Sequence, residues 1–116
     1  NEVVLVTGGS KGLGLAIAKK LVPQGCRIAL CARDMGELEL ARKELQRLGS
    51  TPYIQVCDVS KKEQVDQLIR DVIQNFGKLD IIVNDAGVIM VGALESFTHK
   101  EFDEAMGVMY WGIVNT

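Results

Sequence analysis

The stretch TGGSKGLG, residues 7–14, decides the fold because of what flanks it. Its glycines surround Lys11, the apolar run EVVLVT (2–7) precedes it, and apolar side chains at helical spacing follow it. A strand buried on both faces is apolar throughout, and apolar side chains that repeat every three or four residues are typical of a helix. The stretch therefore predicts a glycine-rich turn that joins a first strand to a first helix.

The same two patterns alternate along the rest of the chain. Runs of β-branched and apolar residues predict strands, and stripes of apolar side chains predict helices that glycine or proline ends. The expected strands are 2–7, 27–32, 52–57 and 79–84, and the expected helices are 13–21, 38–48, 65–76 and one that begins near 98. This alternation predicts an α/β fold in a single domain over residues 1–116, a Rossmann-like, doubly wound parallel sheet with strand order 3-2-1-4.

Capping boxes mark the starts of three of these helices. A side-chain oxygen at the first position accepts from free backbone N–H groups of the first turn, and an acidic residue three positions later completes the box. The boxes are Asp34 with Glu37, Ser60 with Glu63, and Thr98 with Glu101. We therefore expect a helix to begin directly after the first residue of each box.

Charge and composition exclude several classes of protein. The formal net charge is −2 and the basic residues are scattered, so a nucleic-acid-binding surface is not expected. No apolar run reaches the length that a membrane span requires. Cys26, Cys31 and Cys57 lack close spacing, which indicates buried side chains in a reducing compartment, the cytoplasm, rather than disulfides. The only histidine, His99, is far from them in sequence, so no metal site is expected.

The glycine-rich turn is suited to binding an anion. In a doubly wound sheet, the turn after the first strand lies where the strand order reverses. The first N–H groups of the following helix have no partner within it, and together with the helix dipole they attract a group such as a pyrophosphate. Glycine permits positive φ and a close approach of the ligand. The alternative is a tight turn that binds nothing.

Lys11 and Arg33 distinguish between two dinucleotides. An NAD site has an acidic residue at the end of the second strand, where it binds the ribose 2′-hydroxyl. Here Ala32 is followed by Arg33, and two cations suit the 2′-phosphate of NADP. We therefore expect NADP rather than NAD as the cofactor. The alternative is a surface arginine paired with Asp34 or Glu37.

Three motifs, taken in order, match one protein family. TGGSKGLG fits a TGxxxGxG turn, CDV (57–59) resembles a strand end that contacts adenine, and NDAG (84–87) is similar to an NNAG motif. In this combination the chain resembles the short-chain dehydrogenases/reductases. It corresponds to the first half of their usual domain.

The resemblance implies roles for individual residues. Asp58 would cap the adenine amino group, Val59 would lie beside the adenine ring, and Asn84 would steady the central strand. Ala86 and Gly87 would flank the cofactor ribose. The complete expected cofactor-binding set is Gly8, Ser10, Lys11, Gly12, Leu13, Gly14, Arg33, Asp58, Val59, Asn84, Ala86 and Gly87.

The resemblance also implies an activity, the transfer of hydride between nicotinamide and a small-molecule carbonyl or alcohol. The family uses a Tyr-x-x-x-Lys pair, in which the lysine lowers the pKa of a tyrosine that acts as general acid or base. Neither Tyr53 nor Tyr110 has a lysine four positions later, and Met109 stands where the family usually has asparagine. We therefore expect no catalytic residue within this chain. The alternative function is a non-catalytic module that binds a dinucleotide or a partner.

Both ends of the chain look cut, so we expect the cofactor-binding half of a longer enzyme, truncated before the second half of its domain. The helix from residue 98 has almost no polar face, and such a helix is buried on most sides. The resemblance implies a second subunit as its cover, and hence a homo-oligomer, whereas Trp111 in the chain's own core is the alternative. The apolar loop 87–97 either lines the nicotinamide site or contributes only packing.

Overall fold

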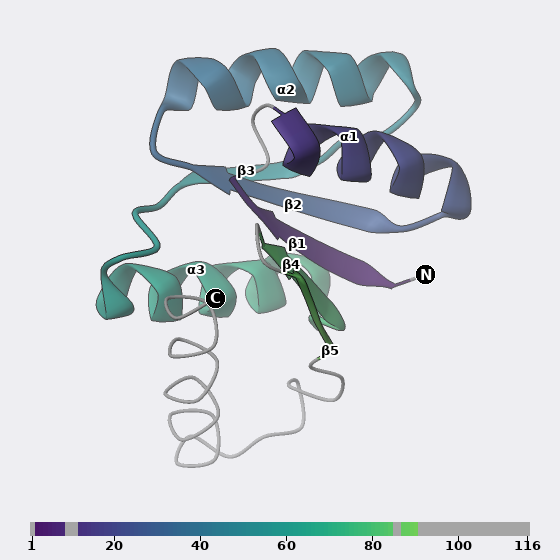
Figure 1. The fold of residues 1–116 in the computed structure, drawn as a ribbon. Coiled ribbons are helices and arrows are strands. Elements are labelled where there is room, and N and C mark those ends of the chain that lie inside the picture. The colour runs from purple at the N-terminus through teal and green to yellow at the C-terminus, as the bar shows by residue number, and fades with distance from the viewer. Residues whose placement is uncertain (1, 9–11, 85–86, 91–116) are drawn as a thin grey trace.

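The computed structural model describes residues 2–8, 12–84 and 87–90, and Figure 1 shows the arrangement of their helices and strands. The last expected helix, with Met109 and Trp111, lies outside the described residues, as do His99 and the third capping box. The elements are β1 (Val3–Thr7), α1 (Gly12–Leu21), the 3-10 helix η1 (Val22–Gln24), β2 (Arg27–Ala32), α2 (Met35–Arg47), β3 (Tyr53–Val56), α3 (Lys62–Phe76), β4 (Ile81–Asn84) and β5 (Gly87–Met90). The four expected strands and the first three expected helices are thus confirmed, with ends that differ by a few residues.

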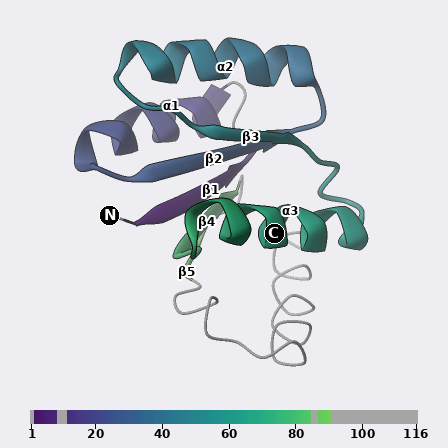
Figure 2. The same ribbon diagram turned by 180° about the vertical axis from the view of Figure 1, so that it is seen from behind.

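The sheet has the strand order β3-β2-β1-β4-β5, and its first four strands are parallel. The expected order 3-2-1-4 is therefore confirmed. Thr7 pairs with Cys31, and Val6 pairs with Val83, so the carboxyl ends of β1, β2 and β4 lie at one edge of the sheet. Helices α1 and α2 cover one face and α3 covers the other, as Figures 1 and 2 show from opposite sides.

Alternation along the central strand divides the core between these two faces. All five residues of β1 are buried, as expected for a strand with helices on both sides. Val3 and Leu5 pack with the apolar side of α3, which includes Leu68, Ile69 and Val72. Val4 and Val6 join the other cluster, in which α1 contributes Ala18 and α2 contributes Leu38, Ala41 and Leu45.

Of the two predicted capping boxes within the described residues, the structure confirms one and contradicts the other. The Asp34 side chain accepts a hydrogen bond from the Gly36 amide at 2.7 Å, so the cap of α2 is confirmed. The prediction that Ser60 caps the next helix is wrong, because α3 starts at Lys62 and is preceded by Lys61, which makes no side-chain cap bond. The carboxylate of Asp58 accepts from both the amide and the hydroxyl of Ser60, at 3.0 and 2.7 Å, and so competes for the serine.

Strand β5 occupies residues for which the sequence predicted a loop. It pairs antiparallel with β4, and Asn84 lies opposite Gly87. An antiparallel partner needs only a short connection, whereas a parallel one needs a long crossover. The rest of the predicted loop, residues 91–97, lies outside the described residues.

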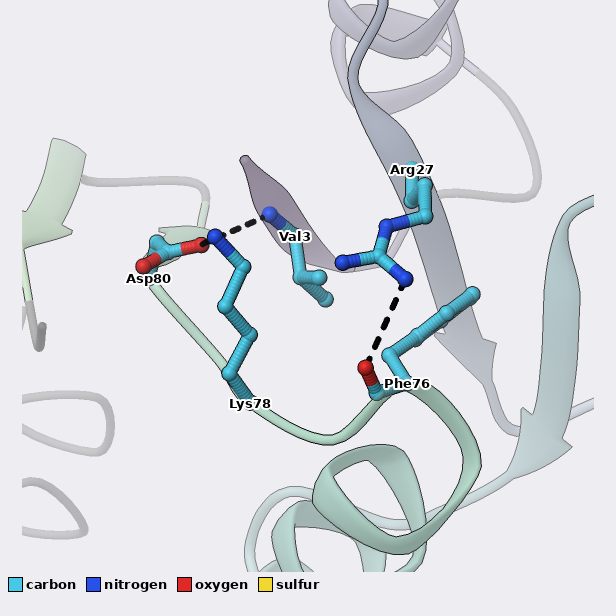
Figure 3. A network of polar contacts seen from close by, with 5 residues as sticks. All are labelled: Val3, Arg27, Phe76, Lys78 and Asp80. Carbon is cyan, nitrogen blue, oxygen red and sulfur yellow. Dashed lines mark hydrogen bonds and ion pairs between the residues drawn. The ribbon is translucent and has the colours of Figure 1, made fainter. Parts of the chain in front are cut away.

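Polar contacts tie together the amino ends of the strands, as Figure 3 shows. The Val3 amide donates to Asp80 at 2.9 Å, and the Lys78 ammonium lies 3.0 Å from the same carboxylate. Arg27 donates to the Phe76 carbonyl at 3.4 Å and lies 5.5 Å from the centre of the Phe76 ring. These contacts fasten the end of α3 to the sheet, at the edge opposite the glycine-rich turn. Within the described part of the chain, no helix is both long and apolar enough to cross a bilayer.

Candidate functional site

The turn between β1 and α1 has the backbone geometry that the sequence predicted. Gly8 and Gly12 have φ values of 65° and 63°, in the left-handed region that favours glycine. A Cβ added at Gly12 would meet no atom within 4 Å, so the space beside this position is open. Ser10 and Lys11 lie outside the described residues, and their predicted roles stay predictions.

The start of α1 has the features of an anion site. Gly12, Leu13 and Gly14 form its first turn, whose N–H groups have no acceptor inside the helix. None of the residues in this turn is acidic, so no carboxylate of the turn itself opposes the positive end of the helix dipole. Leu13, in this turn, is 68% exposed. An open glycine and a first helical turn without acidic residues fit a diphosphate group at this position.

A small hollow lies where α1 meets the ends of β1 and β4. Its volume is about 10 Å³, and it is lined by Thr7, Leu13, Gly14, Ile17, Val83 and Asn84. The Thr7 hydroxyl donates to the Val83 carbonyl at 3.3 Å and so fixes the two strand ends beside each other. The structure therefore brings three predicted site residues together at the point where the strand order reverses, since the chain adds β2 and β3 on one side of β1 and β4 on the other.

Two larger hollows are present, but they lie at the other edge of the sheet. One, of about 340 Å³, is lined by the residues around Arg27 and Phe76, and the other, of about 380 Å³, lies between Tyr53 and the end of α3. Neither contains a predicted site residue. In open α/β sheets, ligands bind beyond the carboxyl ends of the strands, so position and chemistry favour the smaller hollow.

Arg33 and Asp58 lie near each other, beyond the ends of β2 and β3. The Cys57 amide donates to the Ala32 carbonyl at 2.9 Å, which holds the two strand ends together directly before these residues. The hydroxyl and amide of Ser60 lower the pKa of Asp58, and the positive charges of Arg33 and Lys61 lower it further. Arg33 is exposed and Asp58 is half-buried. A guanidinium and a carboxylate thus lie near each other beyond the carboxyl ends of β2 and β3.

The segment after β3 is held against α3. The Asp58 amide donates to the Gln64 side chain at 2.8 Å. Val59 is half-buried and packs on the core cluster beneath α3. Both residues of the predicted adenine contact are therefore fixed in place by neighbours that the sequence reasoning did not consider, Ser60 and Gln64. The spacing of Asp58 and Ser60, which is typical of a turn closed by an aspartate side chain, was the available signal.

The remaining predicted residues fall at the end of β4. Asn84 is the last residue of this strand and is half-buried. Gly87 begins β5, directly opposite it, and Ala86 lies outside the described residues. Among residues 2–8, 12–84 and 87–90, there is no group of three or more histidine, cysteine and acidic side chains that could hold a metal ion.

Two of the three cysteines are buried, as predicted, and they are close to the site. Cys31 and Cys57 are buried, whereas Cys26 is only half-buried, so the prediction for Cys26 is wrong. The Cys31 thiol lowers the pKa of Cys57, whereas the Cys57 thiol and burial raise the pKa of Cys31. Sequence reasoning missed this pair because 26 residues separate the cysteines and only strand register brings them together.

Known proteins are similar to this chain in sequence and in fold. The family model described as short chain dehydrogenase matches residues 2–116. An uncharacterized oxidoreductase of Mycobacterium bovis is 37% identical over 98% of this chain and 46% of its own length. A variant of actinorhodin polyketide ketoreductase, solved with NADPH, has a TM-score of 0.71 at 34% identity, over 90% of this chain and 40% of that one. An NAD+-bound xylitol dehydrogenase has a TM-score of 0.67 at 36% identity, over 70% and 31%.

The family match covers almost every residue of the chain, whereas the chain spans less than half the length of the relatives just described. The expected resemblance is confirmed by the sequence match and by the sheet order. The chain therefore belongs to the short-chain dehydrogenase family.

Proposed function

We propose that the whole protein is an NADP-dependent oxidoreductase, in which this chain is the cofactor-binding half. The reaction is the transfer of hydride between nicotinamide and a carbonyl or alcohol. The observation that carries the choice of NADP is the exposed guanidinium of Arg33, directly after β2, at the position where an NAD site has an acidic residue.

The predicted site residues suggest how a dinucleotide would lie. The amides of Gly12, Leu13 and Gly14 would bind its diphosphate at the start of α1. Arg33 and Lys11 would contact the 2′-phosphate, while Asp58 and Val59 would contact the adenine. Ala86 and Gly87 would flank the cofactor ribose, and Asn84 would steady the central strand. Glycines at 8 and 12 give the turn its shape, and the remaining Ser10 would contribute a hydroxyl at the phosphates.

Similar structures contain both dinucleotides, NADPH in the polyketide ketoreductase and NAD+ in the xylitol dehydrogenase. Family membership alone therefore does not select between the two cofactors. The side chain after β2 is the relevant local difference, because a 2′-phosphate brings negative charge to that position and a 2′-hydroxyl does not.

The bound cofactor supplies the hydride, and the chemistry also needs a proton donor or acceptor. This chain contains no Tyr-x-x-x-Lys pair, so we place the catalytic residues and the substrate-binding loops in the part of the protein that this chain does not span. We also propose a homo-oligomer formed through the helix predicted from residue 98, and a cytoplasmic location, since three cysteines without close spacing suit a reducing compartment.

The test of this function is nicotinamide-linked absorbance in the full-length protein. With NADPH and a panel of aldehydes and ketones, we expect turnover of at least one carbonyl, and the reverse reaction with the corresponding alcohol and NADP. Tight binding of NADPH without turnover of any carbonyl or alcohol would contradict the proposed activity.

That negative result would favour the second candidate function, a dinucleotide-binding module without catalysis. Met109 motivates it, because methionine stands where the family usually has an asparagine, and a thioether cannot replace the hydrogen bonds of an amide. A Met109→Asn variant of the full-length protein distinguishes the two functions. If the proposed enzyme is correct, the protein with Met109 already turns over a carbonyl or alcohol. If the binding module is correct, the protein with Met109 turns over neither.

A further inference from the structure

Hydrogen bonds hold three of the four polar atoms of Asp58. Its amide donates to the Gln64 side chain at 2.8 Å, and its carbonyl oxygen accepts from the Lys61 amide at 3.0 Å. Its Oδ1 atom accepts twice from Ser60, from the amide at 3.0 Å and from the hydroxyl at 2.7 Å. Within residues 2–8, 12–84 and 87–90, the fourth polar atom, Oδ2, has no hydrogen bond.

The main chain on both sides of Asp58 is anchored. The Cys57 amide donates to the Ala32 carbonyl at 2.9 Å, which fastens the preceding residue to β2. Gln64, in the first turn of α3, fastens Asp58 itself to the helix. The carboxylate can therefore move mainly by rotation about its terminal torsion, which is soft in an aspartate. Ser60 restrains that rotation, because turning the carboxylate takes Oδ1 away from both donors of the serine.

The chemistry of Oδ2 selects its partner. An ionised carboxylate only accepts hydrogen bonds, and Asp58 is half-buried beside an exposed Ser60, where a ligand can reach it. Adenine has an amino group at position 6 of the purine, which donates, whereas hypoxanthine has an oxygen there, which accepts. A 6-oxo group opposite Oδ2 would bring two acceptors together without a proton between them, which is unfavourable.

We propose that Ser60 is a positioning residue for recognition of the base. It occupies Oδ1 of Asp58 and so presents Oδ2 to the 6-amino group of adenine, which makes the site select an adenine dinucleotide over one with a 6-oxo purine. The inference rests on the proposed function, in which Asp58 contacts adenine. It adds which atom of the carboxylate makes that contact and which residue holds the atom in place.

The guanidinium of Arg33 is the other donor that could use Oδ2. Its positive charge is near enough to lower the pKa of Asp58. Although both residues belong to the described part of the chain, no ion pair joins them. Arg33 is thus left for the 2′-phosphate and Oδ2 for the base. If Arg33 used Oδ2 instead, loss of the Ser60 hydroxyl would change the preference between NADP and NAD rather than the preference between bases.

Calorimetry of the full-length protein with NADPH and with its hypoxanthine analogue tests the proposal, because the two ligands differ only at the 6-position edge of the purine. The unmodified protein should bind NADPH more tightly, by about tenfold or more. Ser60→Ala should lower this ratio of affinities by at least about threefold. Ser60→Thr, which retains a hydroxyl, should keep the ratio. Ser50→Ala, which removes a serine hydroxyl before β3, at the opposite edge of the sheet, should also keep it.

Asp58→Asn gives a second, independent test. The backbone amide of Ser60 can only donate, so it should hold the oxygen of the new side chain at the place of Oδ1. The amide nitrogen then takes the place of Oδ2 and presents a donor to the base. We therefore expect this variant to bind the hypoxanthine analogue more tightly than NADPH. An unchanged preference for NADPH, or an equal loss of affinity for both ligands, would overturn the proposal.

The measured ratios separate this inference from the proposed function. If Ser60→Ala weakens both ligands equally, Ser60 has only a structural role and the inference is wrong. If it changes the ratio of NADP to NAD and leaves the ratio between bases unmoved, Oδ2 serves Arg33 and the inference is again wrong, although the proposed function stands. If the unmodified protein binds neither NADPH nor the analogue, the proposed function fails and the inference fails with it. Should Ser60→Ala not fold, the preference of Asp58→Asn decides the question.

Discussion

A guanidinium directly after β2 alters the charge at the position where the adenosine ribose would lie. Arg33 is exposed, so binding of a 2′-phosphate need not displace a buried contact. Hydrogen bonds to charged groups contribute about 1.5–3 kcal/mol. We expect Arg33→Ala to weaken NADP binding by about 10- to 100-fold and to leave NAD binding within a few-fold, as measured by calorimetry on the full-length protein.

The matched control for this variant is Arg47→Ala, which removes an exposed arginine at the other end of the sheet, in the last turn of α2. It should leave the affinities for both dinucleotides unchanged. An Arg33→Ala protein that keeps its preference for NADP would show that other residues recognise the 2′-phosphate.

Gly12 is required for its backbone conformation, and this requirement is independent of charge. Its φ of 63° is unfavourable for residues with a Cβ, and a residue forced into this region costs about 1–2 kcal/mol. We expect Gly12→Ala to lower the free energy of unfolding by about that amount and also to weaken dinucleotide binding, because the first turn of α1 shifts.

Gly77→Ala provides the comparison, since Gly77 has a φ of 86° and lies at the end of α3, at the opposite edge of the sheet. It should cost similar stability and leave dinucleotide affinity unchanged. Chemical denaturation and calorimetry of the two variants check this. Equal effects of both substitutions on affinity would mean that the turn has no direct role in binding.

At the scale of elements, α3 contributes one half of the core. Leu68 is buried at 1% exposure, within the cluster that includes Val3 and Leu5. Leu68→Ala should lower the free energy of unfolding by about 2–5 kcal/mol. Gln67→Ala, an exposed neighbour on the same helix, should change it by less than about 0.5 kcal/mol. Urea denaturation measures both, and a small effect of Leu68→Ala would contradict the packing of α3 on the sheet.

The connection between α3 and β4 should be sensitive to acid. The Val3 amide, and to a lesser extent Lys78, lower the pKa of Asp80. A carboxyl whose folded-state pKa is lowered stabilises the fold above its unfolded pKa, and the contribution is lost as the pH falls through its folded pKa. Asp80→Asn should therefore cost about 1 kcal/mol at pH 7, and the difference should disappear below the folded pKa of Asp80.

Stability measured across pH in both proteins checks this window. The control is Glu44→Gln, which removes an exposed ion pair with Lys19 at 3.4 Å, and whose effect should be within about 0.5 kcal/mol at any pH. A cost of Asp80→Asn that persists in strong acid would indicate a loss of packing rather than of charge.

Sequence patterns predicted the elements whose causes are local. Strand β1 is apolar throughout because it is buried on both faces, and α3 has an apolar stripe because it is buried on one. Glycine stands at position 12 because the backbone there has a positive φ. The cap at Ser60 was wrong because the amide and hydroxyl of Ser60 donate to the Asp58 carboxylate, which holds Ser60 in a turn before α3 begins at Lys62. Strand β5 was missed because its pairing with the neighbouring strand β4 determines it, whereas its own sequence pattern does not.

In the candidate site, too, some features could be predicted from the sequence and others could not. The nearness of Arg33 and Asp58 was predictable, since both follow adjacent parallel strands whose ends align. The placement of Cys31 and Cys57 in the same core cluster was not, because it depends on the register of β2 and β3 to within one residue. The periodicity of apolar residues shows which side chains of a strand share a face, whereas the register between two strands is determined by the packed sheet.

At the scale of the whole molecule, the two edges of the sheet differ. Contacts of Asp80 and Arg27 fasten the amino ends of the strands to the end of α3. The carboxyl ends have the glycine-rich turn, the start of α1, and the neighbouring Arg33 and Asp58. This asymmetry is what a family that binds dinucleotides beyond the carboxyl ends requires.

The most direct measurement is the ratio of the dissociation constants for NAD and NADP, obtained by calorimetry on the full-length, reduced protein. A diphosphate at the start of α1, together with cations at the 2′-phosphate, predicts that NADP binds about 10- to 100-fold more tightly than NAD. Equal affinities, or tighter binding of NAD, would contradict the assignment of Arg33. Binding of neither dinucleotide would contradict the site itself.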